Sequence, residues 1–284
     1  MAAFPPPGAP EQLTVALISD VFFSADGAER LAARLREART AGAELAVLPE
    51  IPLNAWVPAH REPSDADAEE LGGLRTRAQQ AAARAAGIGL VGGVIARDTA
   101  TGRRFNTALV IAPDGRILGT YRKLHLPEEP GFWETSHYEP ADDPPRVIEG
   151  FALPLGAQIC SDVNRPEMSH LLGAAGAELI AAPRATESGT FDRWRIVLRA
   201  NALTSAAFVV SANRPAPEEG VPLGGPSIAV GPDGQVLLET LETVAIVSLE
   251  REAIRRARVD YPGYLPVRAR LYAAAWSELA RRDG

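Results

Sequence analysis

The only cysteine of the chain, Cys160, is the first candidate for chemistry, because a thiolate is a strong nucleophile. It ends an apolar run over 151–159 and precedes the segment 161–166, where we expect a helix to begin. At such a turn a cysteine can be held accessible, the helix N-terminus would lower its pKa, and neighbouring amides could stabilise an oxyanion. A lone cysteine is nevertheless more often a buried filler, so its role depends on other residues.

Two charged residues lie where they could assist a nucleophile. Glu50 follows a short predicted strand over 44–49, at the strand end where α/β proteins place ligand groups, and could act as a general base. Taken alone, a surface carboxylate is its more common role. Arg122 and Lys123 point to opposite faces of an extended segment, so one of them faces inward. If that residue is Lys123, its buried ammonium needs a carboxylate partner, for which Glu134 and Glu50 are candidates.

Other chemistries find less support in the sequence. The four histidines follow no metal-ligand spacing, and no second cysteine is available. The sequence contains no G-x-S-x-G turn, no Walker A motif and no dinucleotide fingerprint after a strand. A Cys–His pair between Cys160 and His125 or His137 stays open, because spacing alone does not decide it.

An internal repeat indicates how these residues are positioned. Residues 41–50 read AGAELAVLPE and residues 175–184 read AGAELIAAPR, and each follows a segment with helical spacing of apolar residues. Glu50 and Arg184 therefore occupy equivalent positions in two halves of the chain. Such a symmetry could bring both strand ends to one cleft.

A second repeated pair supports duplication over chance similarity. Residues 108–118 read ALVIAPDGRIL and residues 228–238 read IAVGPDGQVLL, so each contains two β-rich runs joined by Pro-Asp-Gly. Proline presets φ and glycine accepts positive φ, which predicts a hairpin in both places.

The remaining patterns alternate between helices and strands, so we expect an α/β protein whose sheets are covered by helices. Two similar halves favour two sheets packed face to face, with helices outside. We expect a loose arm at 1–10 and one domain at 11–284, whose tail at 259–284 is extended and ends in a short amphipathic piece. Helices are expected at about 27–42, 66–87, 164–176, 190–206 and 251–258, and strands at about 13–18, 44–49, 89–95, 105–112, 115–122, 146–151, 153–160, 178–183, 207–213, 226–231, 235–240 and 243–249.

Composition and charge indicate which kinds of partner the protein binds and in which compartment it is expected. Apolar residues make up 46% of the 284 residues and charged residues 23%, as in ordinary globular proteins. The net charge of −7 argues against binding nucleic acid or an anionic membrane. No apolar run reaches the roughly 18 residues of a membrane span, and the N-terminus lacks the pattern of a signal peptide. With a single cysteine, these features predict a cytoplasmic protein.

Three stretches in this order resemble the nitrilase, or carbon–nitrogen hydrolase, superfamily: LAVLPE ending at Glu50, YRKLHLP containing Lys123, and GAQICSDVNRPE containing Cys160. The resemblance extends from about residue 13 to 265. It implies a four-layer α-β-β-α sandwich of two pseudo-symmetric halves, and a Glu50–Lys123–Cys160 triad assisted by Glu134. The stretch around Glu134 is similar to the branch of N-carbamoylputrescine amidase and related carbamoyl and aliphatic amidases.

The resemblance further implies hydrolysis of a small amide or N-carbamoyl amine through an acyl-enzyme, without a cofactor, in a homodimer or larger homo-oligomer. A nitrile hydrolase would use the same residues, and an ammonia-supplying glutaminase or a non-catalytic binding protein are further alternatives. The sequence departs from common family patterns at Ser161 and at Arg184, which could bind a substrate carboxylate or pair with Glu187. The candidate substrate-binding residues are Ser161, Trp56, Trp133, His137 and Arg184.

Overall fold

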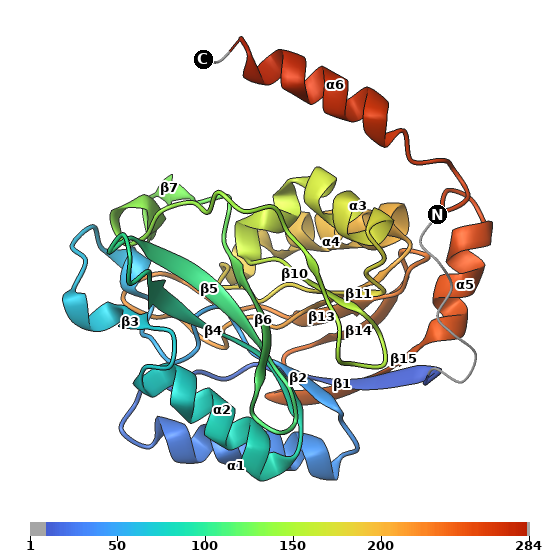
Figure 1. Cartoon of the computed structure of the whole chain (residues 1–284). Coiled ribbons are helices and arrows are strands. Elements are labelled where there is room, and N and C mark those ends of the chain that lie inside the picture. The colour runs from blue at the N-terminus through green and yellow to red at the C-terminus, as the bar shows by residue number, and fades with distance from the viewer. Residues whose placement is uncertain (1–9, 283–284) are drawn as a thin grey trace.

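The computed structural model of the chain describes residues 10–282, in which two β-sheets pack face to face with helices on both outer sides (Figure 1). One apolar cluster joins the sheets, with Val15 and Val47 from one and Leu179 and Val210 from the other. Two further clusters lie between each sheet and its helices. The arrangement confirms the predicted α/β fold class and is consistent with the predicted sandwich.

The first sheet has the order β15-β1-β2-β4-β5-β6, and β3 pairs with β4. The second has the order β14-β13-β12-β11-β10-β9, and β7 and β8 form a separate ribbon. The strands of the first sheet are β1 (Gln12–Ile18), β2 (Leu45–Val47), β3 (Glu69–Glu70), β4 (Gly89–Arg97), β5 (Arg104–Ile111), β6 (Ile117–Arg122) and β15 (Val244–Glu250). The others are β7 (Glu128–Glu129), β8 (Phe132–Trp133), β9 (Val147–Ile148), β10 (Leu155–Ala157), β11 (Leu179–Ala181), β12 (Phe208–Ser211), β13 (Ser227–Val230) and β14 (Val236–Thr240).

The two sheets repeat one pairing scheme, which confirms the predicted duplication. From β15 to β6 the neighbours pair antiparallel, parallel, parallel, antiparallel and antiparallel, and the series from β9 to β14 is the same. Both predicted Pro-Asp-Gly turns form hairpins, with Gly115 at φ 84° and Gly234 at φ 78°. Each hairpin contains a register shift at the same place, so the halves match in detail.

Helices cover each sheet as the periodicity predicts. The helices α1 (Gly27–Thr40) and α2 (Leu74–Ala86) pack on the first sheet, and α3 (Pro166–Ala174) and α4 (Phe191–Ser205) on the second. The helix α5 (Arg251–Val259) follows β15, and α6 (Ala269–Ala280) extends away from the body (Figure 1). Short 3₁₀ turns lie at Val57–Ala59, Asp65–Asp67, Glu134–Ser136, Cys160–Asn164 and Ser188–Thr190.

The predicted helix over 66–87 begins eight residues later than expected. Its N-terminus is set by Glu69, whose carboxylate accepts hydrogen bonds from the backbone N–H groups of Arg75 and Thr76 at 2.8 and 2.7 Å. These donors have no partner within the helix, so a carboxylate placed there stabilises this start. Gly72, at φ 92°, turns the chain between Glu69 and the helix.

The described part of the chain begins at residue 10 and ends at residue 282. Residues 1–9, most of the predicted arm, lie outside the described residues, and the division at 1–10 and 11–284 stays a prediction. The predicted amphipathic piece of the tail is the helix α6, which has no buried residue. Between residues 10 and 282, none of the helices combines the length and the apolar character needed to cross a bilayer.

Candidate active site

The predicted catalytic residues come from strand ends of both sheets. Glu50 follows β2, Lys123 follows β6, and Cys160 follows β10, while Glu134 opens a 3₁₀ turn after β8. The backbone N–H of Glu50 donates to the carbonyl of Arg184, 3.2 Å away, so the equivalent strand ends of the two halves meet. The duplication therefore builds one site at the edge shared by both sheets.

Lys123 is the centre of a buried charge cluster. Its Nζ lies 2.7 Å from Glu50 Oε1 and 2.7 Å from each carboxylate oxygen of Glu134, and none of the three side chains is exposed. Burial alone would lower the pKa of Lys123, but the two carboxylates raise it above its ordinary value. The ammonium therefore stays charged, and the predicted pairing of Lys123 with both glutamates is confirmed.

Glu50 has one occupied and one free oxygen. Its Oε1 accepts from Lys123 and from Asn106 Nδ2, which is also 2.7 Å away. Its Oε2 is buried, and no residue in the described part of the chain bonds to it. A buried carboxylate oxygen without a donor is costly, so this atom is available to accept a proton from a reacting group.

Glu134 carries the second negative charge beside the ammonium. Burial raises the pKa of Glu134, the charge of Lys123 lowers it and that of Glu50 raises it, with a net rise above the usual range. Two carboxylates on one ammonium leave an excess of negative charge. The cluster therefore has a stronger tendency to take up a proton than an ordinary ion pair.

Cys160 has the strained backbone expected of a residue at a sharp strand-to-helix turn. Its φ is 47°, its N–H donates to the carbonyl of Pro183 at 2.8 Å, and its Sγ lies 3.8 Å from the carbonyl of Ala185. The expected lowering of its pKa by a helix N-terminus is wrong: burial, with the nearby charge of Glu50, raises the pKa of the thiol well above its usual value. The thiol therefore needs a base before it can attack.

Asp162, which sequence reasoning missed, holds the cysteine turn against the lysine segment. Its buried carboxylate accepts from the N–H of Ile159 at 3.0 Å, the hydroxyl of Tyr121 at 2.8 Å and the N–H of His125 at 3.0 Å. An aspartate two residues after the cysteine was a signal, because aspartate commonly accepts backbone N–H bonds where a helix begins. Its link to the segment after Lys123 could not be read from the sequence.

Cys160 lines a small pocket at this edge. The pocket has a volume of about 250 Å³, and its wall includes Ser161, Phe132, Thr186 and Trp194. The Ser161 hydroxyl donates to the carbonyl of His125, 2.5 Å away, so the residue is fixed in the wall. Ser161, one of the predicted substrate-binding residues, therefore lines the pocket.

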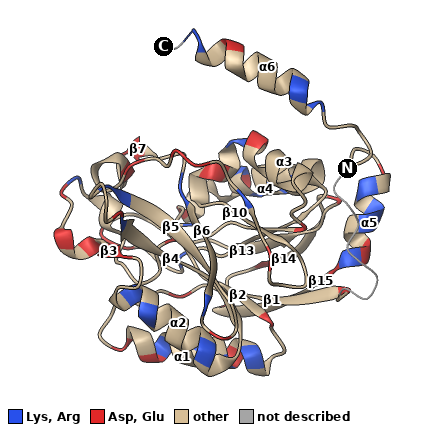
Figure 2. Cartoon of the chain, viewed as in Figure 1, with Lys and Arg blue, Asp and Glu red and all other residues tan. Residues whose placement is uncertain are grey.

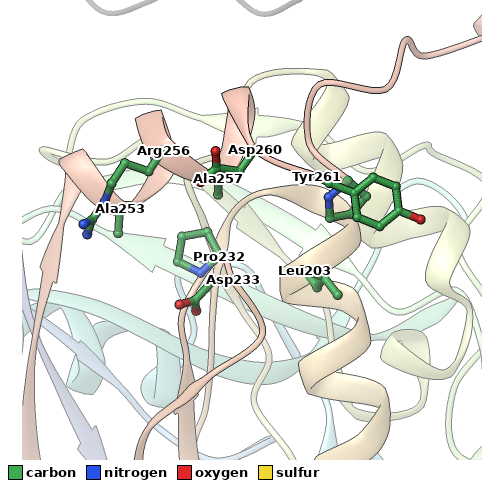
Figure 3. A pocket seen from close by; sticks show the side chains of 9 residues that line it. Leu203, Pro232, Asp233, Ala253, Arg256, Ala257, Asp260 and Tyr261 are labelled. Carbon is green, nitrogen blue, oxygen red and sulfur yellow. The ribbon is translucent and has the colours of Figure 1, made fainter.

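A larger hollow, of about 330 Å³, lies below α5 (Figure 3). Pro232, Asp233, Arg256 and Tyr261 are among its lining residues, which include no cysteine and none of the four predicted catalytic residues. It therefore lacks the nucleophile and the charge cluster that the chemistry requires.

The other predicted substrate-binding residues do not line the pocket. Trp56 is buried and donates from Nε1 to the carbonyl of Gly131 at 2.8 Å, and its ring packs edge-on against Phe132. Trp133 stacks with Arg61, whose guanidinium carbon is 3.6 Å from the ring centre. His137 is buried, with its Nε2 2.7 Å from the carbonyl of His60. Contact of these three residues with a substrate stays a prediction.

Arg184 is buried behind the pocket wall. Its guanidinium donates to Ser211 Oγ at 2.7 Å, Thr186 Oγ1 at 2.9 Å and the carbonyl of Pro226 at 2.6 Å. It forms no ion pair with Glu187 or any other carboxylate within residues 10–282, and burial lowers its pKa to about 10. Of the two sequence alternatives, pairing with Glu187 is therefore not observed, and carboxylate binding stays a prediction.

The chain is similar to known amidases and to a nitrilase. The human omega-amidase NIT2 is 29% identical over 260 residues, covering 87% of this chain and 91% of the relative, and a nitrilase of Pyrococcus abyssi is 30% identical over 230 residues, covering 80% and 84%. A variant of the amidase from Nesterenkonia sp. AN1, solved with the acetamide moiety of fluoroacetamide on its active-site cysteine, superposes with a TM-score of 0.75 at 26% identity, covering 96% and 99%. The family model for carbon–nitrogen hydrolases matches residues 23–259. The chain belongs to the carbon–nitrogen hydrolase family.

Proposed function

We propose that the enzyme hydrolyses the carbon–nitrogen bond of a small amide or N-carbamoyl amine through an acyl-enzyme on Cys160. One observation carries the proposal: Lys123 and Asn106 hold Oε1 of Glu50, while Oε2 is buried without a donor. The carboxylate is thus fixed in orientation and still able to accept a proton. The thiol of Cys160, whose pKa is raised by burial, is the group that needs this base.

The proposed reaction divides the work among the buried groups. Glu50 takes the thiol proton as Cys160 attacks the carbonyl carbon, and the positive charge of Lys123 stabilises the oxyanion together with the N–H of Ser161. Glu50 then protonates the departing ammonia or amine. Water activated by Glu50 hydrolyses the thioester, while Glu134 keeps Lys123 charged and in place. No cofactor enters these steps.

The pocket size indicates a small substrate, since a volume of about 250 Å³ lies just below the usual range of ligand pockets. A small nitrile is the alternative substrate, because the Pyrococcus abyssi nitrilase is 30% identical to this chain. The same nucleophile and base would attack a nitrile carbon, so the two classes must be separated by measurement.

The test measures ammonia and acid released from a panel of matched amides, N-carbamoyl amines and nitriles. The Cys160→Ala variant should release neither product, and the control Ser205→Ala, which alters a buried small residue at the end of α4, should match the wild type. Acid from amides but not from matched nitriles supports the proposal, whereas the reverse supports the nitrilase alternative. Full activity of Cys160→Ala would contradict both.

We also propose that two copies of the chain associate through α6. The helix exposes the apolar side chains of Leu271, Tyr272, Trp276 and Leu279, each between 45% and 59% accessible. In Figure 1 it extends away from the two sheets and their helices. Residues 261–282 contain four arginines and one glutamate on a chain of net charge −7, and Figure 2 shows the arginines at the two ends of α6. The net negative charge of a second copy therefore complements the arginines of this helix, and association would cover its exposed apolar side chains.

Sedimentation equilibrium tests the association. Trp276→Glu should shift the wild-type dimer toward monomer, whereas Leu74→Glu, at an exposed position on the opposite side of the fold, should not. A wild-type protein that is monomeric at micromolar concentration would contradict the proposal.

A cytoplasmic location completes the proposal. The support for it is that the only cysteine, Cys160, must remain a reduced thiol in order to act as a nucleophile. Fractionation of cells expressing the tagged chain would test it, and recovery outside the cytoplasm would contradict it.

A further inference from the structure

The turn that presents Glu50 has an unusual backbone. Ile51, the next residue, has a φ of 39°, which β-branched side chains rarely adopt. Ile51 is buried, and within the turn its carbonyl accepts one bond, from the N–H of Asn54 at 3.0 Å. Strained positions of this kind persist where surrounding groups hold them. Some contact from outside the turn must therefore stabilise it.

That contact is Arg214, which follows β12 in the second half of the chain. Its Nη2 donates to the carbonyls of Glu50, Ile51 and Asn54 at 3.2, 2.8 and 2.9 Å, and its Nε also reaches the carbonyl of Glu50 at 3.3 Å. Its Nη1 is 2.5 Å from Glu218 Oε2, which fixes the other edge of the guanidinium. The side chain is completely buried, so water does not compete for these donors.

The contacts of Arg214 are concentrated on one short segment. Three carbonyls from residues 50–54 accept from a single guanidinium, although the chain separates Arg214 from Glu50 by 164 positions. The planar, forked arrangement of donors makes this possible, and the single ammonium of a lysine could not reproduce it. Placing such a charge in the interior is costly unless its donors are used, and burial indeed lowers the pKa of Arg214.

We propose that Arg214 is a positioning residue for the reaction, which holds the turn after Glu50 so that Oε2 of the carboxylate stays in reach of the Cys160 thiol. The inference rests on the proposed function, since it assumes that Glu50 is the base. In the turn, Arg214 donates only to backbone carbonyls, and it takes no part in bond making. Its loss should therefore lower kcat and leave substrate binding at the pocket wall nearly unchanged.

Arg251 provides a matched control. It is also a buried arginine, with one carboxylate partner, Glu178 at 2.8 Å, and bonds to the carbonyls of Pro10 and Ala152. Its contacts fix the start of β1 and the second sheet, and none involves Glu50 or Cys160. Arg251→Ala therefore measures the effect of removing a buried arginine clamp as such.

The experiment compares kcat and KM of Arg214→Ala, Arg214→Lys and Arg251→Ala, each with and without millimolar methylguanidine, on the fraction that is folded by circular dichroism. We expect Arg214→Ala to lower kcat by about 10²-fold, the effect of a small misplacement of a catalytic group, with KM within threefold. Methylguanidine should restore kcat at least tenfold, because it can occupy the vacated space and donate to the same carbonyls. Arg214→Lys should stay impaired, and Arg251→Ala should keep its kcat per folded molecule and not respond to methylguanidine.

Two results would overturn the inference. One is an unchanged kcat in Arg214→Ala, and the other is a loss of kcat that methylguanidine restores equally in Arg251→Ala. If Arg214→Ala does not fold, Glu218→Gln tests the same contact, because it loosens the guanidinium without removing it and should lower kcat about tenfold with KM retained. Cys160→Ala and Glu50→Gln separate the two proposals: if they retain turnover, the proposed function fails, whereas if only Arg214→Ala retains it, the positioning role alone fails.

Discussion

Replacing Glu134 by glutamine removes one of the two charges that hold the lysine and changes the shape of the site very little. Both oxygens of Glu134 lie 2.7 Å from Lys123 Nζ, and neither side chain is exposed. In Glu134→Gln, one oxygen still accepts a hydrogen bond, while the amide group turns a donor toward the ammonium. Lys123 then depends on Glu50 alone for a counter-charge.

The magnitude follows from the distance. Two unit charges 2.7 Å apart attract by about 6 kcal/mol at an effective dielectric constant of about 20, and desolvation offsets part of this. Breaking a buried pair typically costs about 3–5 kcal/mol, and we expect the lower end because Glu50 remains. A loss of about 3 kcal/mol lowers Tm by about 6–12 °C in a protein of this size. We expect kcat to fall by about 10²–10³, because Glu50 is held as the sole counter-ion and no longer serves freely as a base.

Ammonia release gives kcat and KM of each variant, and calorimetry gives its Tm. The control is Glu139→Gln, five positions after Glu134 in the sequence. Glu139 is exposed and pairs with Arg103 at 2.6 Å. Exposed pairs contribute about 0–1 kcal/mol, so this variant should resemble the wild type in both assays. A kcat of Glu134→Gln within threefold of the wild type, in a folded protein with unchanged Tm, would show that Lys123 does not need the charge of Glu134.

Two further predictions concern neighbours of this cluster, and a third concerns the packing of α3 against α4. Burial raises the pKa of Cys160 above its ordinary 9.0, so the folded protein keeps this thiol protonated to a higher pH than the unfolded chain does. The neutral thiol therefore favours the folded state fully below the ordinary pKa, and this contribution to stability is lost as pH rises toward the folded-state pKa. Urea unfolding at pH 8 and 10 should therefore show the wild type losing about 1.4 kcal/mol more than Cys160→Ser, and equal losses would contradict it. Asn106→Ala should lower kcat about tenfold, because it removes the 2.7 Å hydrogen bond to Glu50. Asn106→Asp should lower kcat further, because it adds a third carboxylate to the site. Steady-state kinetics in which the aspartate variant is more active than the alanine variant would contradict this. Gly173→Ala should cost about 1–3 kcal/mol in urea unfolding, since its Cβ would lie 2.4 Å from the carbonyl oxygen of Ser205, and an unchanged midpoint would show that α3 and α4 can separate freely.

Much of the fold was predictable because apolar periodicity marks its elements directly. The repeated strand and hairpin segments led to two equivalent sheets, and the helices α1, α3, α4 and α5 begin and end within two residues of the predicted bounds. The start of α2 could not be predicted in the same way. It depends on Glu69, a residue outside the helix whose carboxylate reaches back to the first turn across Gly72 and Gly73.

Only part of the site could be predicted from local sequence patterns. Glu50, Lys123 and Cys160 end strands or follow them, so their positions were readable from local patterns, and Lys123 does meet both glutamates. Asn106 and Arg214 were not identified, because each acts through a contact between distant segments. An asparagine in a strand and an arginine after one carry no local sign that they bond to Glu50.

If Cys160 is the nucleophile, it carries the acyl group during turnover, and intact-protein mass spectrometry detects this covalent adduct. The wild type and Cys160→Ala are mixed with the best amide substrate, quenched in acid within the first turnover, weighed and digested. We expect a mass increase equal to one acyl group on the wild type, located on the peptide that contains Cys160, and none on Cys160→Ala. Ammonia release in the first turnover without any adduct, or an acyl group on a peptide that lacks Cys160, would contradict it.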